Sequence, residues 1–156
     1  SSSIDMIAAG GPGRNVKVWE TTNWSLVTTL SEHETWVQST LFSPNGDYLI
    51  SGSSKPFFSG GSQIIVWATS DWSIVKTITE DTDDVQKMNF LPTSNYFAST
   101  WSSNQLRIFE ANTWTTSQTI SIGAGPDYVE FSNNGRWLIS LGEDYGSAQV
   151  WVKIQK

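Results

Sequence analysis

A repeated pattern of about 42 residues limits this chain more than any other feature of its sequence. Short apolar runs that alternate with polar residues end in an aromatic side chain four times, in steps of 48, 42 and 42 residues. These aromatics are Trp19, Trp67, Phe109 and Trp151. The first three are followed five residues later by a second tryptophan, at Trp24, Trp72 and Trp114. Recurrence at a fixed spacing predicts equivalent structural units placed one after another.

Within one unit, four runs of five to eight residues are rich in β-branched and aromatic side chains and are separated by turn residues. In the second full unit the predicted strands are residues 72–79, 85–90, 96–100 and 105–110. The dipeptides Asn45-Gly46 and Asn134-Gly135 are typical of tight hairpins because glycine tolerates a positive φ. The pattern therefore predicts four short antiparallel strands per unit and no helix.

One such unit has too small a core to stand alone, whereas units arranged radially bury the faces of their sheets against one another. The segments that carry this pattern most fully are residues 30–33, 42–46, 49–53 and 66–67. They resemble a repeat of the WD-repeat β-propeller family. The resemblance implies an all-β propeller segment of about 3.5 repeats with four-stranded antiparallel blades.

We expect one partial propeller over residues 1–156. Its divisions are the end of a first repeat at 1–22 and further repeats at 23–70, 71–112 and 113–156. The phase of the repeat predicts fourteen strands, with the innermost strand missing from the first blade and the outermost from the last. Closed propellers have about 4 to 8 blades, so we do not expect a complete ring. Three completions are open: a longer parent chain, a second copy or different chain, and a four-bladed closure.

The resemblance also implies a stabilising network of a loop Asp, a strand Ser or Thr, the strand Trp and a His. His33, Ser51 and Trp67 match three of these positions, but the loop at 54–62 contains no Asp. The third repeat has Ser99 but Phe109 in place of the tryptophan. None of the four aromatics is followed by the Asp that names the family, so we expect divergent repeats.

The composition excludes several classes of function. The formal charge is −6, and the nine Lys and Arg residues do not cluster, which argues against a partner with a phosphate backbone such as nucleic acid. The chain has no cysteine and a single histidine, so it offers no thiolate ligand and no multi-histidine metal cage. We therefore expect no cofactor, no metal and no catalytic residue. No long apolar stretch indicates a membrane partner, and we expect a cytoplasmic protein.

In the resembled family, one surface gathers the loops that lead into the innermost strands and those that join second to third strands. Nine of the fifteen acidic residues fall in these loops. They are Glu32, Glu34, Glu80, Asp81, Asp83, Asp84, Asp127, Glu143 and Asp144. Such a surface would favour a basic peptide by charge complementarity. The alternative is a solvated acidic rim without a partner.

Aromatic residues in or beside the same loops would anchor a partner, since exposed aromatics often dominate binding. The predicted partner-binding residues are Trp36, Glu34, Asp83, Asp84, Asp127, Phe57, Phe58 and Tyr145. The alternative for Phe57 and Phe58 is burial on their own blade. We expect the repeating tryptophans, Trp24 included, to form core, and His33 to be structural rather than a catalytic base.

The carboxylates at residues 80–84 do not have the spacing of a calcium-binding loop. The sequence therefore predicts a non-catalytic scaffold for protein interactions. Two alternatives are open: a purely architectural propeller in a large assembly, and a propeller enzyme with polar groups around a central channel.

Overall fold

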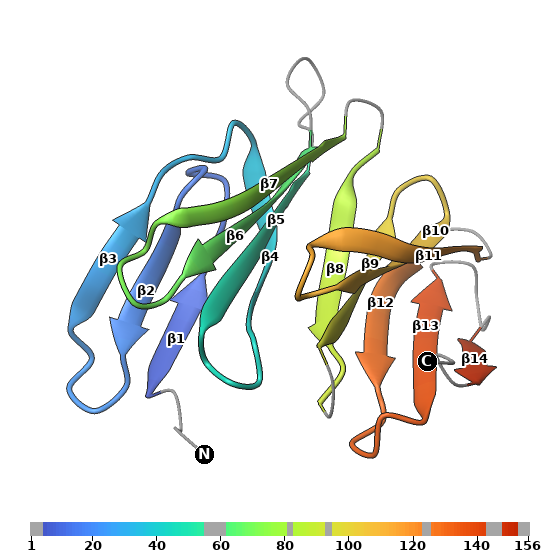
Figure 1. Cartoon of the computed structure of the whole chain (residues 1–156). Helices are drawn as coiled ribbons and strands as arrows, with labels where there is room; N and C mark the ends of the chain where they lie inside the picture. The colour runs from blue at the N-terminus through green and yellow to red at the C-terminus, as the bar shows by residue number, and fades with distance from the viewer. Residues whose placement is uncertain are drawn as a thin grey trace. The chain divides into compact units, whose positions relative to one another are not determined.

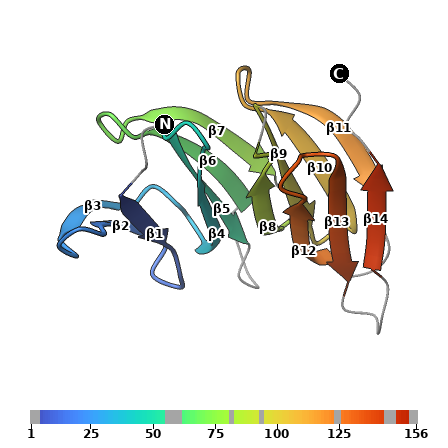
Figure 2. The same ribbon diagram turned by 90° about the horizontal axis from the view of Figure 1, so that it is seen from below.

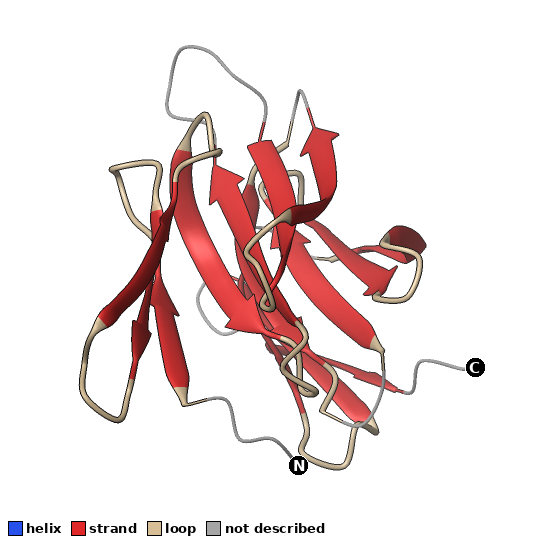
Figure 3. Cartoon of the chain, turned by 60° about the vertical axis from the view of Figure 1, so that its left-hand side comes forward, coloured by secondary structure: helices blue, strands red, loops and turns tan. Residues whose placement is uncertain are grey.

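The structure is a computed structural model that describes residues 5–54, 62–80, 83–92, 95–122, 126–142 and 148–152. Within these ranges the chain consists of strands and connecting loops, with no helix (Figure 3). The prediction of an all-β chain is confirmed. Among the residues described, none belongs to a helix that could cross a membrane.

The contacts between residues divide the chain into two compact units, residues 1–85 and 86–156. The first unit contains two antiparallel sheets (Figure 1). One sheet has the order β1 (Met6–Ala9), β2 (Val16–Glu20) and β3 (Leu26–Leu30). The other has the order β4 (Trp36–Phe42), β5 (Tyr48–Ser54), β6 (Ser62–Ala68) and β7 (Ile74–Glu80).

The second unit also contains two antiparallel sheets. Figure 2 shows the strands of one of them, β12, β13 and β14, side by side. The four-stranded sheet consists of β8 (Val85–Phe90), β9 (Tyr96–Trp101), β10 (Gln105–Glu110) and β11 (Thr115–Ser121). The three-stranded sheet consists of β12 (Pro126–Phe131), β13 (Trp137–Gly142) and β14 (Ala148–Val152). In every sheet the strands lie in the order of the chain. The described residues form fourteen strands, as predicted, and the fold class of a partial propeller with four-stranded antiparallel blades is confirmed.

The repeating aromatics occupy equivalent positions in their sheets. Trp19, Trp67 and Phe109 each pair with an apolar residue of the preceding strand, at Ile7, Leu49 and Phe97. Each also follows a β-bulge in the pairing with the next strand, after Val18, Val66 and Ile108. A bulge recurring at the same register shows that the sequence repeat is also a backbone repeat.

The hairpin turns have the geometry that the Asn-Gly dipeptides predict. Gly46 and Gly135 have φ values of 84° and 66°, and each donates its N–H to the carbonyl oxygen of a serine three residues earlier. The predicted start of the strand at Trp72 is wrong, because β7 begins at Ile74. Trp72 lies instead in the preceding turn with a φ of 62°, where its N–H bonds to the carbonyl oxygen of Ala68.

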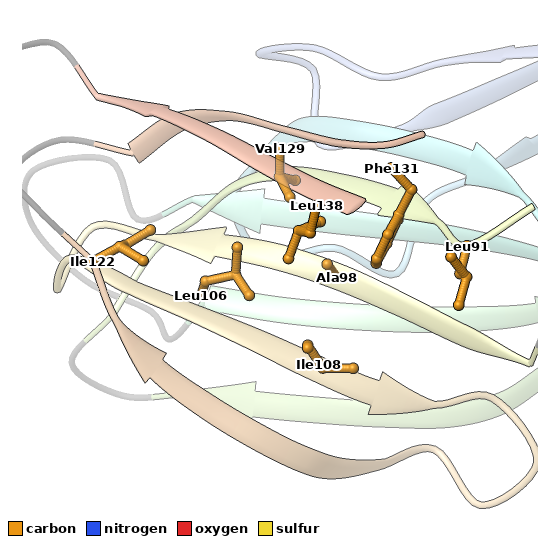
Figure 4. Close-up of a cluster of buried hydrophobic side chains, with 8 residues drawn as sticks. All are labelled: Leu91, Ala98, Leu106, Ile108, Ile122, Val129, Phe131 and Leu138. Carbon is orange, nitrogen blue, oxygen red and sulfur yellow. The ribbon is translucent and has the colours of Figure 1, made fainter. Parts of the chain in front are cut away.

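Each unit has its own hydrophobic core between its two sheets. In the first unit, Val16, Val18 and Leu30 of one sheet pack with Leu49 and Trp67 of the other. In the second unit, side chains of β9 and β10 face those of β12 and β13 (Figure 4). Its buried members are Leu91, Ala98, Leu106, Ile108, Ile122, Val129, Phe131 and Leu138.

The prediction that all three turn tryptophans form core is wrong for Trp24, whose side chain is 69% exposed. Trp72 packs against the core of the first unit, and Trp114 is buried. Trp24 lies in the turn that joins β2 to β3, in the sheet β1–β3, one face of which packs on the core. The other face of this sheet carries Ile7 and Leu26, and no described side chain of the first unit covers it. The indole of Trp24 is therefore exposed, although its turn has the same backbone conformation as those of Trp72 and Trp114.

The two sheets of the first unit are joined closely at the ends of β1 and β4. Val37 donates its backbone N–H to the carbonyl oxygen of Gly11 at 3.2 Å, and Thr40 donates its hydroxyl to the carbonyl oxygen of Ala8 at 3.1 Å. A Cβ atom on Gly10 would lie 2.3 Å from Cγ1 of Val37. Only a residue without a side chain fits there.

Candidate functional site

The loop that enters β4 in the first unit alternates buried and exposed side chains. His33 and Thr35 are buried, whereas Glu32, Glu34 and Trp36 are exposed. Polar groups beneath the loop therefore hold it while two carboxylates and an indole face outward.

Beneath the loop, three buried side chains meet at the hydroxyl of Ser51 on β5. The distance from Nε2 of His33 to Oγ of Ser51 is 2.6 Å. Nε1 of Trp67 donates to the same oxygen at 2.9 Å, and the Ser51 hydroxyl is 3.4 Å from the carbonyl oxygen of Ile65. The predicted group of His33, Ser51 and Trp67 is thus assembled, which confirms that His33 belongs to a structural network.

The role of Nε2 of His33 in its bond to Ser51 depends on where the Ser51 hydroxyl sends its one hydrogen. A serine hydroxyl has one hydrogen and two lone pairs. If the hydrogen goes to Ile65, both lone pairs accept, one from Trp67 and one from Nε2–H of His33. Nδ1 of His33 is then a lone pair, and it has no hydrogen-bond partner within the described part of the chain. Burial lowers the pKa of His33 to about 4, so the ring is neutral at pH 7.

Residues of β6 hold the loop from its other side. Gln63 accepts the backbone N–H of Glu34 at its Oε1, 3.3 Å away, and its own backbone N–H donates to the hydroxyl of Ser53 at 3.0 Å. The adjacent Ser62 donates its hydroxyl to the carbonyl oxygen of Asp83. β6 therefore connects the loop that bears Trp36 with the chain segment that bears Asp83 and Asp84.

Of the predicted partner-binding residues, Trp36 is 41% exposed and Glu34 is exposed beside it in the same loop. Asp83 is only 4% exposed, and its Oδ1 accepts the backbone N–H of Asp84, which is half-buried. The side chain of Asp83 is thus less accessible than that of Glu34. We call the exposed side chains of Glu32, Glu34 and Trp36 the entry-loop surface.

The remaining predicted residues lie elsewhere. Asp127 is in β12 of the second unit. Phe57, Phe58 and Tyr145 lie outside the described residues. The structure therefore brings Glu34 and Trp36 together in one loop and connects them through β6 to Asp83 and Asp84.

Sequence reasoning did not find Gln63, which braces the loop, or the role of Trp101 in the second unit. Trp101 is fully buried, and its Nε1 donates to Oγ of Ser99 at 2.5 Å. The guanidinium carbon of Arg107 lies 4.1 Å from the centre of its ring, a cation–π contact. The signal in the sequence was the spacing of two between Ser99 and Trp101, which places both side chains on one face of a strand.

The described residues contain no group of three or more His, Asp or Glu side chains that could hold a metal ion. The carboxylates of Glu32 and Glu34 are exposed. Exposed carboxylates can form charge-assisted hydrogen bonds.

Comparison with known proteins assigns one of these repeats. Residues 24–68 match the family described as WD domain, G-beta repeat. These residues are a WD repeat. The match extends from the turn at Trp24 through β3, β4 and β5 to the end of β6 at Ala68, and so includes His33, Ser51 and Trp67.

Curated relatives match a segment of similar length. The chain is 45% identical over 51 residues to Nuclear distribution protein nudF of Aspergillus niger, which is 33% of this chain and 11% of that protein. It is 41% identical over 51 residues to Nuclear distribution protein nudF 2 of Talaromyces marneffei, again 33% and 11%. It is 36% identical over 50 residues to a Lissencephaly-1 homolog of Caenorhabditis briggsae, 32% of this chain and 13% of that protein. The chain thus matches about a tenth of the length of these relatives.

Proposed function

We propose that this chain is a non-catalytic scaffold that binds a basic segment of a protein partner at the entry-loop surface. Proteins with WD repeats generally act as scaffolds for protein interactions, and two of the relatives named above are called Nuclear distribution protein. The finer assignment, an acidic and aromatic surface for a basic partner, is our proposal for this chain.

The observation that carries the proposal is the alternation of the entry loop. The inward side chain of His33 is held by Ser51 and the backbone of Glu34 by Gln63, while Glu32, Glu34 and Trp36 face outward. A loop fixed before binding loses little conformational entropy when a partner docks. An exposed indole beside carboxylates suits lysine or arginine, which can lie on the ring and pair with the acids.

We further propose that Asp84, Asp127, Phe57, Phe58 and Tyr145 extend this surface, and that Asp83 supports it from beneath. The remaining blades would come from a longer parent chain or from another subunit, and the protein would act in the cytoplasm.

The test is a titration of a fluorescently labelled peptide rich in lysine and arginine against the wild-type chain, followed by anisotropy. Trp36→Ala is expected to weaken binding by about tenfold or more, as truncation of a central aromatic contact does. Glu34→Gln is expected to weaken it less and to reduce its dependence on salt.

The matched control is Trp137→Ala, because Trp137 is also an exposed strand tryptophan but belongs to the second unit. This variant is expected to bind the peptide as the wild type does. Equal weakening by Trp36→Ala and Trp137→Ala, or tighter binding of an acidic peptide of the same length, would contradict the proposal.

A further inference from the structure

The outermost strands of the sheets differ in how well their free edges are protected. Among the described residues, β3 pairs only with β2, β7 only with β6, and β11 only with β10. Each of the three therefore has backbone N–H and C=O groups along one edge that no described strand pairs. Natural proteins usually protect such edges with charged side chains or proline.

β3 and β11 are the outer strands that lack this protection. The sequence of β3, Leu-Val-Thr-Thr-Leu, contains no charge and no proline. β7 carries Lys76 and Glu80, and β11 is composed of polar residues except for Ile120. An edge strand that is both uncharged and apolar is the most receptive to another strand, and of the three only β3 is both.

The side chains at the start of β3 are apolar and open to solvent. Leu26 is 53% exposed and Val27 is 43% exposed. Two residues earlier, the indole of Trp24 is exposed on a backbone with a φ of 60°, a conformation that bulky side chains rarely adopt. At the corresponding positions of β11 the residues are Thr116 and Ser117, and Trp114 is buried. β7 also exposes two apolar side chains at its start, Ile74 at 45% and Val75 at 43%, but it carries charged residues. Of the three outer strands, β3 is the one that combines exposed apolar side chains with the absence of charge and proline.

We propose that the edge of β3 binds an extended, uncharged segment of another protein, which adds to the sheet β1–β3 as a further antiparallel strand. The unpaired backbone groups would supply the hydrogen bonds, as in other cases of strand addition. Leu26 and Val27 would select aliphatic or β-branched side chains, and Trp24 would cover one end of the added segment.

The length of the edge favours a short segment of a partner over a second copy of this chain. Five residues in β3 span about 17 Å, and pairing along so short an edge buries much less than the roughly 1,000 Å² that a stable interface requires. A second copy paired through β3 alone would not hold together. A flexible peptide segment needs only this edge, and the binding would be weak and reversible.

This surface is independent of the proposed entry-loop surface. Trp24, Leu26 and Val27 lie at the start of β3, whereas the entry loop begins after its last residue, Leu30. The two surfaces also differ in chemistry, because the first is apolar and the second acidic.

The experiment uses an acetylated and amidated peptide of alternating threonine and valine as the probe, titrated into the isotope-labelled chain. Binding is followed by the amide resonances of β3. A twin peptide that is N-methylated at alternate residues serves as a control, because it cannot donate hydrogen bonds along one edge. The variants are Val27→Lys and Trp24→Ala, and the matched control is Ser117→Lys at the corresponding position of β11.

We expect the unmodified peptide to shift the amides of β3, and Val27→Lys to weaken its binding by about tenfold or more. Ser117→Lys is expected to leave binding unchanged, and the N-methylated twin not to bind. Because Val27 and Ser117 are both exposed, thermal melting should show that each lysine variant stays folded.

Three results would overturn the proposal. The first is binding of the N-methylated twin as tight as that of the unmodified peptide. The second is a shift pattern confined to β11 or to the entry loop. The third is a mass that doubles with concentration in the absence of peptide and returns to that of a monomer in Val27→Lys, which would assign the edge to a second copy.

Discussion

The sheets β4–β7 and β8–β11 contain the same buried serine but bond it to different aromatic donors. Ser51 and Ser99 occupy the same position, nine residues after Phe42 and Phe90. Ser51 receives the indole N–H of Trp67 from the neighbouring strand β6, whereas Ser99 receives that of Trp101 from its own strand β9.

The position of Trp67 is taken in the second sheet by Phe109, which has no hydrogen to donate. Its ring stacks on Phe97 with centroids 4.8 Å apart and planes at 8°. Phe90 and Trp114 also lie against Phe97, with centroids 5.6 and 6.4 Å away. Two equivalent sheets can therefore keep the hydrogen bond from an indole to the buried serine although the indole belongs to different strands. In the sheet β8–β11, the position that corresponds to Trp67 is filled by apolar packing instead.

The largest expected effect is the loss of either indole. Trp67→Ala and Trp101→Ala should each lower the free energy of unfolding by about 3–5 kcal/mol, because both side chains are almost fully buried. Urea denaturation followed by circular dichroism measures this. Trp137→Ala, at an exposed position, is the control and should cost less than about 1 kcal/mol. A small effect of Trp101→Ala would show that the second sheet does not depend on the relocated donor.

The next effect separates the sheets by pH, because His33 is the single histidine of the chain. The unfolded chain binds a proton at His33 near pH 6.5, but burial delays this in the folded chain until about pH 4. The contribution of His33 to the free energy of unfolding is therefore fully present above pH 6.5. It decreases as the solution is acidified, and below about pH 4 this group causes no further loss. The loss should reach about 3 kcal/mol.

His33→Gln isolates the contribution of His33, because it removes this titratable group and no other. The difference in unfolding free energy between wild type and variant should shrink from pH 7 to pH 4. Parallel curves over this range would show that His33 is protonated as readily in the folded chain as in the unfolded one.

Removing the serines gives a smaller and graded effect. Ser51→Ala leaves two buried polar groups without their partner, the indole N–H of Trp67 and Nε2 of His33, and should cost about 2–4 kcal/mol. Ser99→Ala leaves only the Trp101 donor and should cost about 1–2 kcal/mol. In the double variant Ser99→Ala/Trp101→Phe, the second change should cost less than it does alone, since the unpaired donor is gone. Equal costs for the two serines would contradict the difference between the networks.

The smallest effect concerns the turn tryptophans. Trp24→Asn should change stability by less than about 1 kcal/mol, in the stabilising direction, because asparagine tolerates a positive φ and the exposed indole contributes little. Trp114→Asn has the same backbone geometry but a buried side chain, so it should be clearly destabilising. Thermal melting of the pair distinguishes the two. A large loss for Trp24→Asn would mean that its indole packs on the fold.

Much of the fold could be predicted because strand position, turn position and aromatic position all repeat with one period. The group around Ser51 was also predictable, since three of its four family positions are present in the sequence. The exposure of Trp24 was not predictable from the repeat. Equivalent residues share a backbone conformation, but their burial depends on whether a neighbouring sheet covers that face.

The candidate site was less predictable than the fold. Trp36 and Glu34 could be placed in a loop by the repeat, but the burial of Asp83 depends on the hydroxyl of Ser62 and on packing that no local pattern encodes. The role of Gln63 could not be predicted for a similar reason, because its hydrogen bond to Glu34 joins residues 29 positions apart in the sequence. The role of Trp101 was hidden by the expectation that the donor stays on the strand after the serine.

The contact between Gly10 and Val37 has a practical consequence for anyone who wishes to graft new specificity onto this scaffold. Cβ atoms added to Gly11 and Gly13 would meet nothing within 4 Å, whereas one added to Gly10 would overlap Val37. A randomised library in this loop should therefore start at residue 11 and hold Gly10 constant. The residue that must stay constant, Gly10, and the first residue that can be varied, Gly11, are therefore adjacent in the chain.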